Sequence, residues 1–204
     1  MTGRAASPPA PFIGLTGAVA SGKSAALEAF ERAGAATLST DAVTHELLAG
    51  KALAQQVAER WGREAAPGGV VDRDKVGEIV FGSPEELRWL ESLLHPLVGR
   101  RMVEWRASLP PDATLAVVEV PLLFETGMDA AFDATVCVIA PDELRAERAG
   151  ARGTEMLTER EAKQLSQDEK AARATHVLVN EGSLSDLQAA VADLTANLSA
   201  EGGS

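Results

Sequence analysis

The feature that most constrains the fold is the glycine-rich stretch GAVASGKS at residues 17–24, which fits the pattern G-x-x-x-x-G-K-[ST]. It follows an apolar run, Phe12 to Thr16, and precedes a segment with helical periodicity that ends near Gly34. A loop of this pattern between a strand and a helix is typical of nucleotide phosphate binding. The alternative is a glycine turn that only connects the two elements.

Each residue type in this loop suits the binding of phosphate. Glycines let backbone N–H groups turn inward, and the start of the helix adds the positive end of its dipole. Lys23 is expected to reach the β and γ phosphates of ATP, and the Ser24 hydroxyl is expected to bind Mg²⁺. The residues expected to contact the nucleotide here are Gly17, Ala20, Ser21, Gly22, Lys23, Ser24 and Ala25.

Short apolar runs alternate with longer helical ones, which predicts an α/β fold with a parallel sheet flanked by helices. Several runs are apolar on successive residues, as expected for strands buried on both faces. Cys137, the only cysteine, lies in such a run and is expected to be a core residue, so no intrachain disulfide can form. The expected strands are residues 12–16, 35–39, 115–120, 135–140 and 176–180.

The chain is expected to divide into a core with appended segments. The core comprises residues 12–42, 109–141 and 175–199. Residues 43–108 are mostly helical and predict a helical substrate domain, and the polar helical stretch 142–174 is a candidate lid. Residues 1–11, rich in Ala, Ser and Pro, are expected to form a flexible arm, and residues 200–204 a flexible tail.

One helix of the insertion has a well-marked start. Ser83 is the expected N-cap, Pro84 takes the first helical position and Glu86 completes a capping box. Pro96 is expected to bend or end this helix near His95.

Net charge and hydropathy exclude several classes of protein. The formal net charge of −11 opposes binding to nucleic acid, which requires a basic surface. No run approaches the roughly 18 to 20 apolar residues of a membrane span, and the N-terminus lacks the apolar region of a secretory signal. We therefore expect a cytoplasmic protein with no nucleic-acid partner and no membrane association.

Asp41 follows the second expected strand. Because carboxyl ends of parallel strands form the ligand-binding edge of such sheets, it could face the same cleft as Lys23 and deprotonate a substrate hydroxyl. It could equally be an N-cap for a helix over residues 42–48. Spacing alone leaves both interpretations open.

The remaining polar candidates are weaker. Glu119 could hold a water bound to Mg²⁺, Glu125 could be a solvated surface residue, and His95 could be a core histidine. Arg145, Arg148 and Arg152 recur along one helix face. Such a row is usually a solvated face, but an arginine can also stabilise a transferred phosphoryl group.

In their order and spacing, these segments resemble the dephospho-CoA kinase family from Phe12 to about Leu194. The matching segments are IGLTGAVASGKS, STDAVTHELL, VDRDKVGEIVF, LLHPLV, VEVPLLFE, FDATVCVIAPDELRAERAGARG and QLSQDEKAARATHVLVNEG. The resemblance implies a P-loop core and the ATP- and Mg²⁺-dependent phosphorylation of the ribose 3′-hydroxyl of 3′-dephospho-CoA. The sequence leaves two alternatives, another P-loop nucleoside or nucleotide kinase and a non-catalytic ATP-binding module.

The resemblance also assigns roles to individual residues. Asp41 matches the acid that activates the hydroxyl, Lys23 the phosphate-binding lysine and Arg148 an arginine of the lid. Asn180 and Gly182 fall where the family's loop approaches the adenine of ATP. The residues matching the acceptor side are Arg73, His95, Pro121, Leu122 and Glu125.

Four positions depart from the family pattern. Ala18 and Ala20 replace two glycines of the loop, which restricts its φ angles. Ser39 and Thr175 replace frequent aspartates, and Ser39 puts a second acidic metal contact in doubt. Because Lys23, Ser24 and Asp41 are retained, we expect an active enzyme.

Overall fold

The computed structural model describes residues 10–150 and 164–201, and its chain divides into two compact units. The sheet unit comprises Met1–Ser39 and Leu109–Ser204, and the helical unit comprises Thr40–Ser108. The expected N-terminal arm lies almost wholly outside the described residues, as do residues 151–163 of the expected lid.

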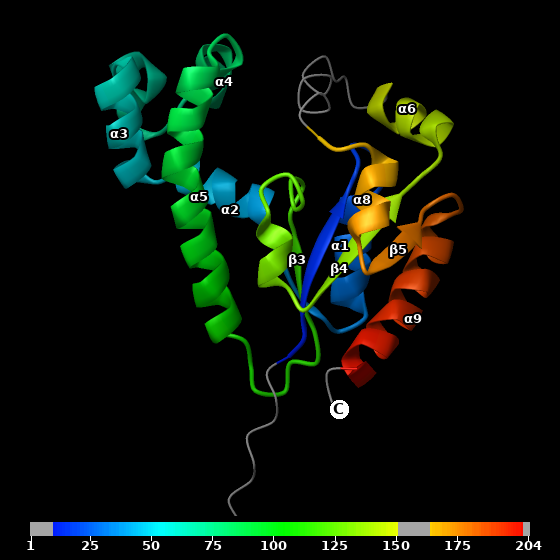
Figure 1. Cartoon of the computed structure of the whole chain (residues 1–204). Helices are drawn as coiled ribbons and strands as arrows, with labels where there is room; N and C mark the ends of the chain where they lie inside the picture. Colours follow the sequence, from blue (N-terminus) through cyan, green and yellow to red (C-terminus); the bar gives the residue numbers. More distant parts are fainter. Residues whose placement is uncertain (1–9, 151–163, 202–204) are drawn as a thin grey trace, which may run out of the picture. The chain divides into compact units, whose positions relative to one another are not determined.

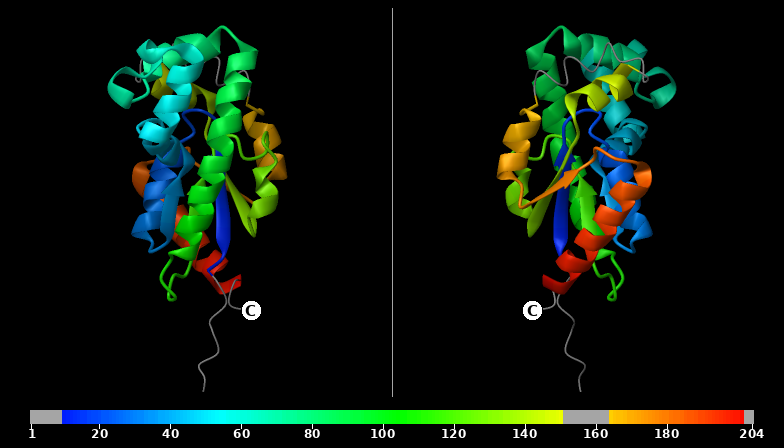
Figure 2. Two further views of the ribbon diagram at one scale, coloured as in Figure 1. Left: turned by 90° about the vertical axis from the view of Figure 1, so that its left-hand side faces the viewer. Right: turned by 90° about the vertical axis from the view of Figure 1, so that its right-hand side faces the viewer.

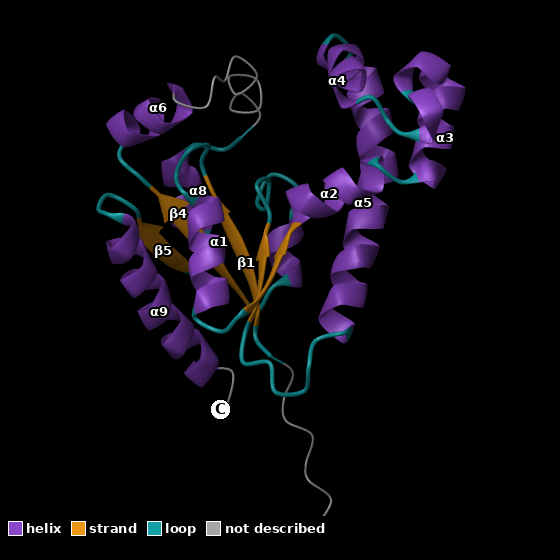
Figure 3. Ribbon diagram, turned by 180° about the vertical axis from the view of Figure 1, so that it is seen from behind, coloured by secondary structure: helices purple, strands orange, loops and turns teal. Residues whose placement is uncertain are grey.

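The sheet unit contains a five-stranded sheet in which all neighbouring strands are parallel (Figure 3). The strand order is β2-β3-β1-β4-β5. All five expected strands are confirmed to within one residue at either end. The strands are β1 (Phe12–Gly17), β2 (Ala36–Ser39), β3 (Ala116–Glu119), β4 (Ala134–Ile139) and β5 (His176–Val179).

The strand order reverses at β1, because the chain passes to one side for β2 and β3 and to the other for β4 and β5. In parallel α/β sheets, ligands bind at the carboxyl ends of the strands next to such a reversal. The glycine-rich loop follows β1 directly, so the topology places it at this position.

Helices cover both faces of the sheet. The helices α1 and α9 pack against each other on one face, and α8 lies on the other, so that α1 and α8 flank β1 from opposite sides (Figures 1 and 2). Ile13, Leu15, Phe30 and Val191 are buried in the core beneath α1 and α9. The helices of the unit are α1 (Lys23–Arg32), α6 (Asp142–Gly150), α8 (Gln167–Arg173) and α9 (Leu184–Glu201).

The opposite face of the sheet also carries buried side chains. The Phe132 ring stacks on Phe12 with ring centroids 4.6 Å apart, and a side chain on Gly14 would come within 3.0 Å of that ring. Cys137 is fully buried here, which confirms the prediction of a core residue. Burial raises the pKa of its thiol to about 11, although the charges of Lys170 and Lys23 oppose the rise.

The helical unit contains no strand among its described residues, as expected. Two short 3₁₀ turns, Arg63–Ala65 and Pro67–Gly69, join its second and third helices. Leu53, Val57 and Leu90 are buried in its own core. Its helices are α2 (Thr40–Leu48), α3 (Lys51–Trp61), α4 (Arg73–Phe81) and α5 (Pro84–Ala107).

The start of α5 confirms one half of the expected capping box. The Ser83 hydroxyl accepts a hydrogen bond from the Glu86 N–H, and Pro84 takes the first helical position. The reciprocal bond was wrongly expected: the Ser83 N–H donates to the Val80 carbonyl, and the Glu86 carboxylate binds Arg60 instead. A charged donor from a neighbouring helix outcompetes the local amide.

Pro96 does not end α5, which continues for eleven residues to Ala107. Proline removes one backbone hydrogen bond from a helix interior. Buried side chains on both sides of Pro96, Leu90 before it and Val98 and Met102 after it, hold the helix together by packing. No helix in the described ranges is both long and apolar enough to cross a membrane.

Candidate active site

The loop at residues 17–24 has a backbone that depends on glycine at two positions. Gly22 has a φ of 100°, and a side chain there would collide with the Asn180 amide. A side chain on Gly17 would collide with the Val138 carbonyl of β4. Ala20, with a φ of 60°, is the one described non-glycine residue with a positive φ, so the loop keeps its left-handed turn despite the alanine.

The start of α1 faces this loop without a side-chain cap. Gly22 is the N-cap residue and has no side chain, so it makes no capping hydrogen bond to the first turn of the helix. The Lys23 ammonium donates to the carbonyls of Gly17 and Ala18, at 3.1 and 2.8 Å. A phosphate in the loop would compete with these carbonyls for the same protons.

Asn180, just after β5, braces the loop from outside. Its side-chain amide donates to the Ser21 carbonyl at 2.8 Å, and the residue is only 6% exposed. Ser21 is fully buried, and its hydroxyl has no hydrogen-bond partner among the described residues. The adenine contact expected of Asn180 stays a prediction, whereas its contact with the loop was not foreseen.

Gly182 lies two residues before α9, where a side chain would meet the Asp186 carboxylate at 2.6 Å. That carboxylate accepts from the Ser183 N–H and hydroxyl, which lowers its pKa. Gly182 therefore leaves room for a helix cap, and its expected adenine contact stays a prediction.

A cavity of about 300 Å³ lies beside the loop in the sheet unit. Arg145 lines it and joins α6 to the loop: its Nε donates to the Val19 carbonyl at 3.0 Å, and its Nη1 pairs with Asp142 at 2.9 Å. The lining residues are Ala18, Val19, Asp142, Arg145, Gln164, Leu165, Ser166, Gln167 and Asp168.

The expected arginine row has different surroundings at each position. Arg145 contacts the loop, so the prediction that this row is only a solvated helix face is wrong for Arg145. Arg148 is partly buried, and its Nη1 is shielded from solvent without a hydrogen-bond partner in the described parts of the chain. Arg152 lies outside the described residues.

Three acceptor-side candidates, Pro121, Leu122 and Glu125, follow β3 in the sheet unit. The Pro121 carbonyl accepts from the Thr16 hydroxyl at 3.3 Å and from the Lys170 ammonium at 2.7 Å. The Glu125 side chain is only 12% exposed and pairs with Lys170 at 3.0 Å. The alternative that Glu125 is a solvated surface residue is therefore wrong.

Lys170 was missed by sequence reasoning. It is fully buried on α8, although the stretch around it is polar and carries several charges. The available signal was the alanine-rich segment KAARA, since small residues allow a helix to approach a sheet closely.

Three further candidates lie in the helical unit. Asp41 is exposed in the first turn of α2, which begins at Thr40, so the N-cap alternative is wrong: Asp41 lies inside the helix. His95 is exposed on α5, so the core-histidine alternative is also wrong. Arg73 is the first residue of α4 and is exposed beside its N-cap, Asp72.

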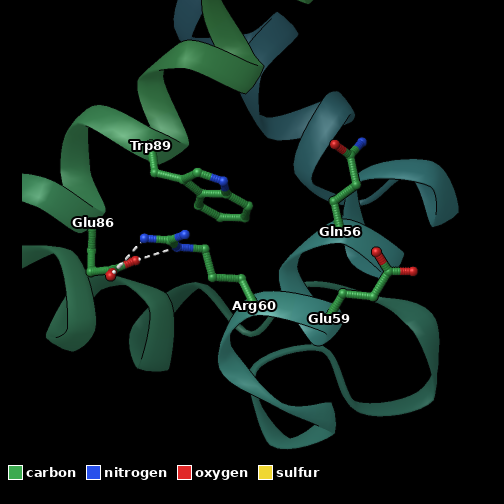
Figure 4. A pocket seen from close by; sticks show the side chains of 5 residues that line it. All are labelled: Gln56, Glu59, Arg60, Glu86 and Trp89. Atoms are coloured by element: carbon green, nitrogen blue, oxygen red, sulfur yellow. Dashed lines mark hydrogen bonds and ion pairs between the residues drawn. The ribbon is translucent and has the colours of Figure 1, made fainter.

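The helical unit has a polar pocket of about 510 Å³, lined by Gln56, Glu59, Arg60, Glu86 and Trp89 (Figure 4). The Arg60 guanidinium lies 5.0 Å from the centre of the Trp89 ring and binds Glu86 through two hydrogen bonds. These bonds, with one from the Trp61 indole, hold the pKa of Glu86 below its ordinary value. The Arg60 guanidinium is therefore already paired with the Glu86 carboxylate.

Comparison with known proteins identifies related sequences over most of the chain. The family model for dephospho-CoA kinase matches residues 11–186. A dephospho-CoA kinase from Thermus thermophilus is 38% identical over 197 residues, which covers 94% of this chain and 95% of the relative. One from Brucella melitensis is 35% identical over 191 residues, with coverage of 92% and 94%.

Solved structures agree with these sequence matches. A crystal structure of TT1252 from Thermus thermophilus superposes with a TM-score of 0.79 at 38% identity, covering 93% of this chain and 98% of the other. A dephospho-CoA kinase from Campylobacter jejuni superposes with a TM-score of 0.70 at 25% identity and the same coverage.

Proposed function

We propose that the loop of residues 17–24 and Asp41 carry out the reaction of the dephospho-CoA kinase family, to which the chain belongs. In this reaction, 3′-dephospho-CoA is phosphorylated with ATP. The observation that supports the proposal best is the loop itself. Its left-handed turn, its uncapped helix start and its lysine ammonium together form a site for a triphosphate.

In this proposal the nucleotide phosphates replace the loop carbonyls as partners of Lys23. The backbone N–H groups of the loop are proposed to bind the β phosphate, and the ammonium neutralises charge on the β and γ phosphates. Asn180 keeps the loop in shape through Ser21. The loop therefore needs little rearrangement to accept ATP, which favours tight binding.

Asp41 is proposed to accept or align the proton of the ribose 3′-hydroxyl as that oxygen attacks the γ-phosphorus in line. Its exposed carboxylate, in the first turn of α2, is open to a substrate. The protein supplies positioning and charge stabilisation, because phosphoryl transfer requires little covalent chemistry from side chains. Arg148, whose Nη1 has no described partner, is proposed to stabilise the charge on the transferred group.

On the acceptor side we assign Arg73, His95, Pro121, Leu122 and Glu125 to 3′-dephospho-CoA. Arg73 and His95 are exposed, and Pro121 and Leu122 are partly exposed, so a ligand can reach these four. Glu125 is mostly buried and is held in place by Lys170. Closure of residues 142–174 as a lid would exclude water, which otherwise competes with the ribose as acceptor.

The residues around the loop fit a Mg²⁺ ion. Ser24 offers an exposed hydroxyl in the first turn of α1, and Glu119 ends β3, so the local donors are oxygens, which Mg²⁺ prefers. Ser24 would hold the ion directly and Glu119 through a water. When bound, the ion neutralises charge on the phosphates of ATP. We also propose that the enzyme works in the cytoplasm with these small-molecule substrates alone.

The test is ADP formation with and without 3′-dephospho-CoA, measured for the wild type and for Asp41→Asn. A general base contributes about 10²- to 10⁴-fold, so Asp41→Asn should lose at least about 100-fold in kcat. A rate within about threefold of wild type would refute the assigned role of Asp41.

An acceptor panel tests the alternatives, neither of which the family match favours. Nucleosides, nucleotides and CoA itself, whose 3′-position is already phosphorylated, should give no ADP above background. Equal ADP release with and without any acceptor would instead support a regulatory ATP-binding module.

A further inference from the structure

The strongest unexplained feature of the sheet unit is the buried ammonium of Lys170. The side chain is fully buried, and it donates to the Pro121 carbonyl at 2.7 Å and lies 3.0 Å from a Glu125 carboxylate oxygen. It also reaches the Gln164 side chain at 3.5 Å. The proposed reaction uses none of these contacts directly.

A buried ion pair of this kind is weak evidence for a stabilising role. The cost of removing two charges from water often exceeds their attraction, and apolar replacements of similar volume are frequently as stable. What the pair does provide is geometric specificity, because charged hydrogen bonds fix the positions of the groups that make them.

The pair ties together segments that are distant in sequence. Glu125 accepts from the Leu165 N–H at 2.9 Å, so the described end of the candidate lid is attached to the segment after β3. The Pro121 carbonyl also accepts from Thr16, the residue directly before Gly17. One carbonyl therefore links the entrance of the phosphate-binding loop, α8 and the segment 121–125.

We propose that Lys170 is a positioning residue that holds segment 121–125 at a fixed distance from the phosphate-binding loop. The inference rests on the proposed function, in which this segment binds the acceptor. In-line transfer requires the acceptor oxygen to lie close to the γ-phosphorus, and a displacement of about 1 Å can cost roughly 100-fold in rate. Lys170 acts through Pro121 and Glu125 and touches neither substrate.

The experiment compares Lys170→Met, Glu125→Gln and the double variant in the full chain. The readouts are thermal stability, ATP affinity by titration, and kcat and KM for 3′-dephospho-CoA. The matched control is Lys75→Met, which removes an exposed lysine that pairs with Glu64 at the same 3.0 Å. Exposed pairs contribute little, so the control should match wild type in every readout.

Lys170→Met should be the least stable variant, because it leaves the Glu125 carboxylate buried without its cation. The double variant should recover much of that stability. In both variants, kcat/KM for 3′-dephospho-CoA should fall by about 10- to 100-fold, whereas ATP affinity should stay within about threefold of wild type. Recovered stability without recovered acceptor turnover separates positioning from folding, and the Glu125→Gln single variant measures how much of the loss comes from that side chain's own proposed contact with the acceptor.

Two results would overturn the inference. One is a double variant whose kcat/KM for 3′-dephospho-CoA lies within about threefold of wild type, since the pair would then be structural only. The other is an equal loss of ATP affinity and acceptor turnover. A wild type that forms no ADP with 3′-dephospho-CoA would refute the proposed function as well, so the two failures are distinguishable.

Discussion

Replacing Gly22 with alanine tests the structure of the phosphate-binding loop most sharply. Gly22 has a φ of 100°, which residues with a side chain rarely adopt. The new methyl group would also occupy the place of the Asn180 amide, whose bond to the Ser21 carbonyl would break. Gly22→Ala therefore combines backbone strain with the loss of a buried hydrogen bond.

The expected cost follows from these two contributions. A left-handed conformation costs a residue with a side chain about 1–2 kcal/mol. Leaving buried polar groups unsatisfied costs about 1–3 kcal/mol. The free energy of unfolding should therefore fall by about 2–5 kcal/mol, which for a chain of this length lowers Tm by roughly 4–20 °C.

The assay is thermal and urea unfolding of wild type, Gly22→Ala and Gly34→Ala. Gly34 has a similar φ of 92° but nothing within 4 Å of an added side chain, so Gly34→Ala should lose only the strain, about 1–2 kcal/mol. Adding Asn180→Ala to Gly22→Ala should cost little more, because the amide is already displaced. If Gly22→Ala is no less stable than Gly34→Ala, the described packing of Asn180 on the loop is wrong.

Three further predictions use single sites. Asn180→Ala should lower the free energy of unfolding by about 1–3 kcal/mol and weaken ATP binding, because the Ser21 carbonyl loses its donor. Unfolding and ATP titration measure the two effects. If neither changes, Asn180 does not brace the loop. For Glu86, a lowered folded pKa means that its contribution to stability is present at neutral pH and is lost as the pH falls through and below the ordinary value of 4.5. The stability difference between wild type and Glu86→Gln should accordingly shrink in acid, and a constant difference would refute the ion pair with Arg60. The Cys137 thiol, with a pKa of about 11, should resist alkylation at pH 8 until the protein is unfolded, whereas rapid labelling of the folded chain would show that it is accessible.

The strands and the loop could be predicted because their signals are local. The run TVCVIA is short and rich in β-branched residues, which favours a buried strand over a buried helix. The order of glycines and Lys23 is typical of a phosphate-binding loop. The start of α5 was similarly readable from Ser83 and Pro84.

Contacts between distant residues could not be predicted. Glu86 looked like a capping residue, yet Arg60, 26 positions earlier, takes its carboxylate. The sequence left open whether Glu125 is a solvated surface residue, and it did not single out Lys170. Only the fold brings α8 against the segment after β3. The bracing of Ser21 by Asn180 spans 159 positions and left no sequence signal.

The central claim is that the loop holds ATP while its γ-phosphoryl group passes to the ribose 3′-hydroxyl. The direct test follows the phosphoryl group from γ-labelled ATP in the presence of 3′-dephospho-CoA, with wild type and Lys23→Ala side by side. The account predicts that wild type places the label on the 3′-position of CoA and that Lys23→Ala transfers almost none. Label released only as inorganic phosphate, or transfer by Lys23→Ala at the wild-type rate, would contradict it.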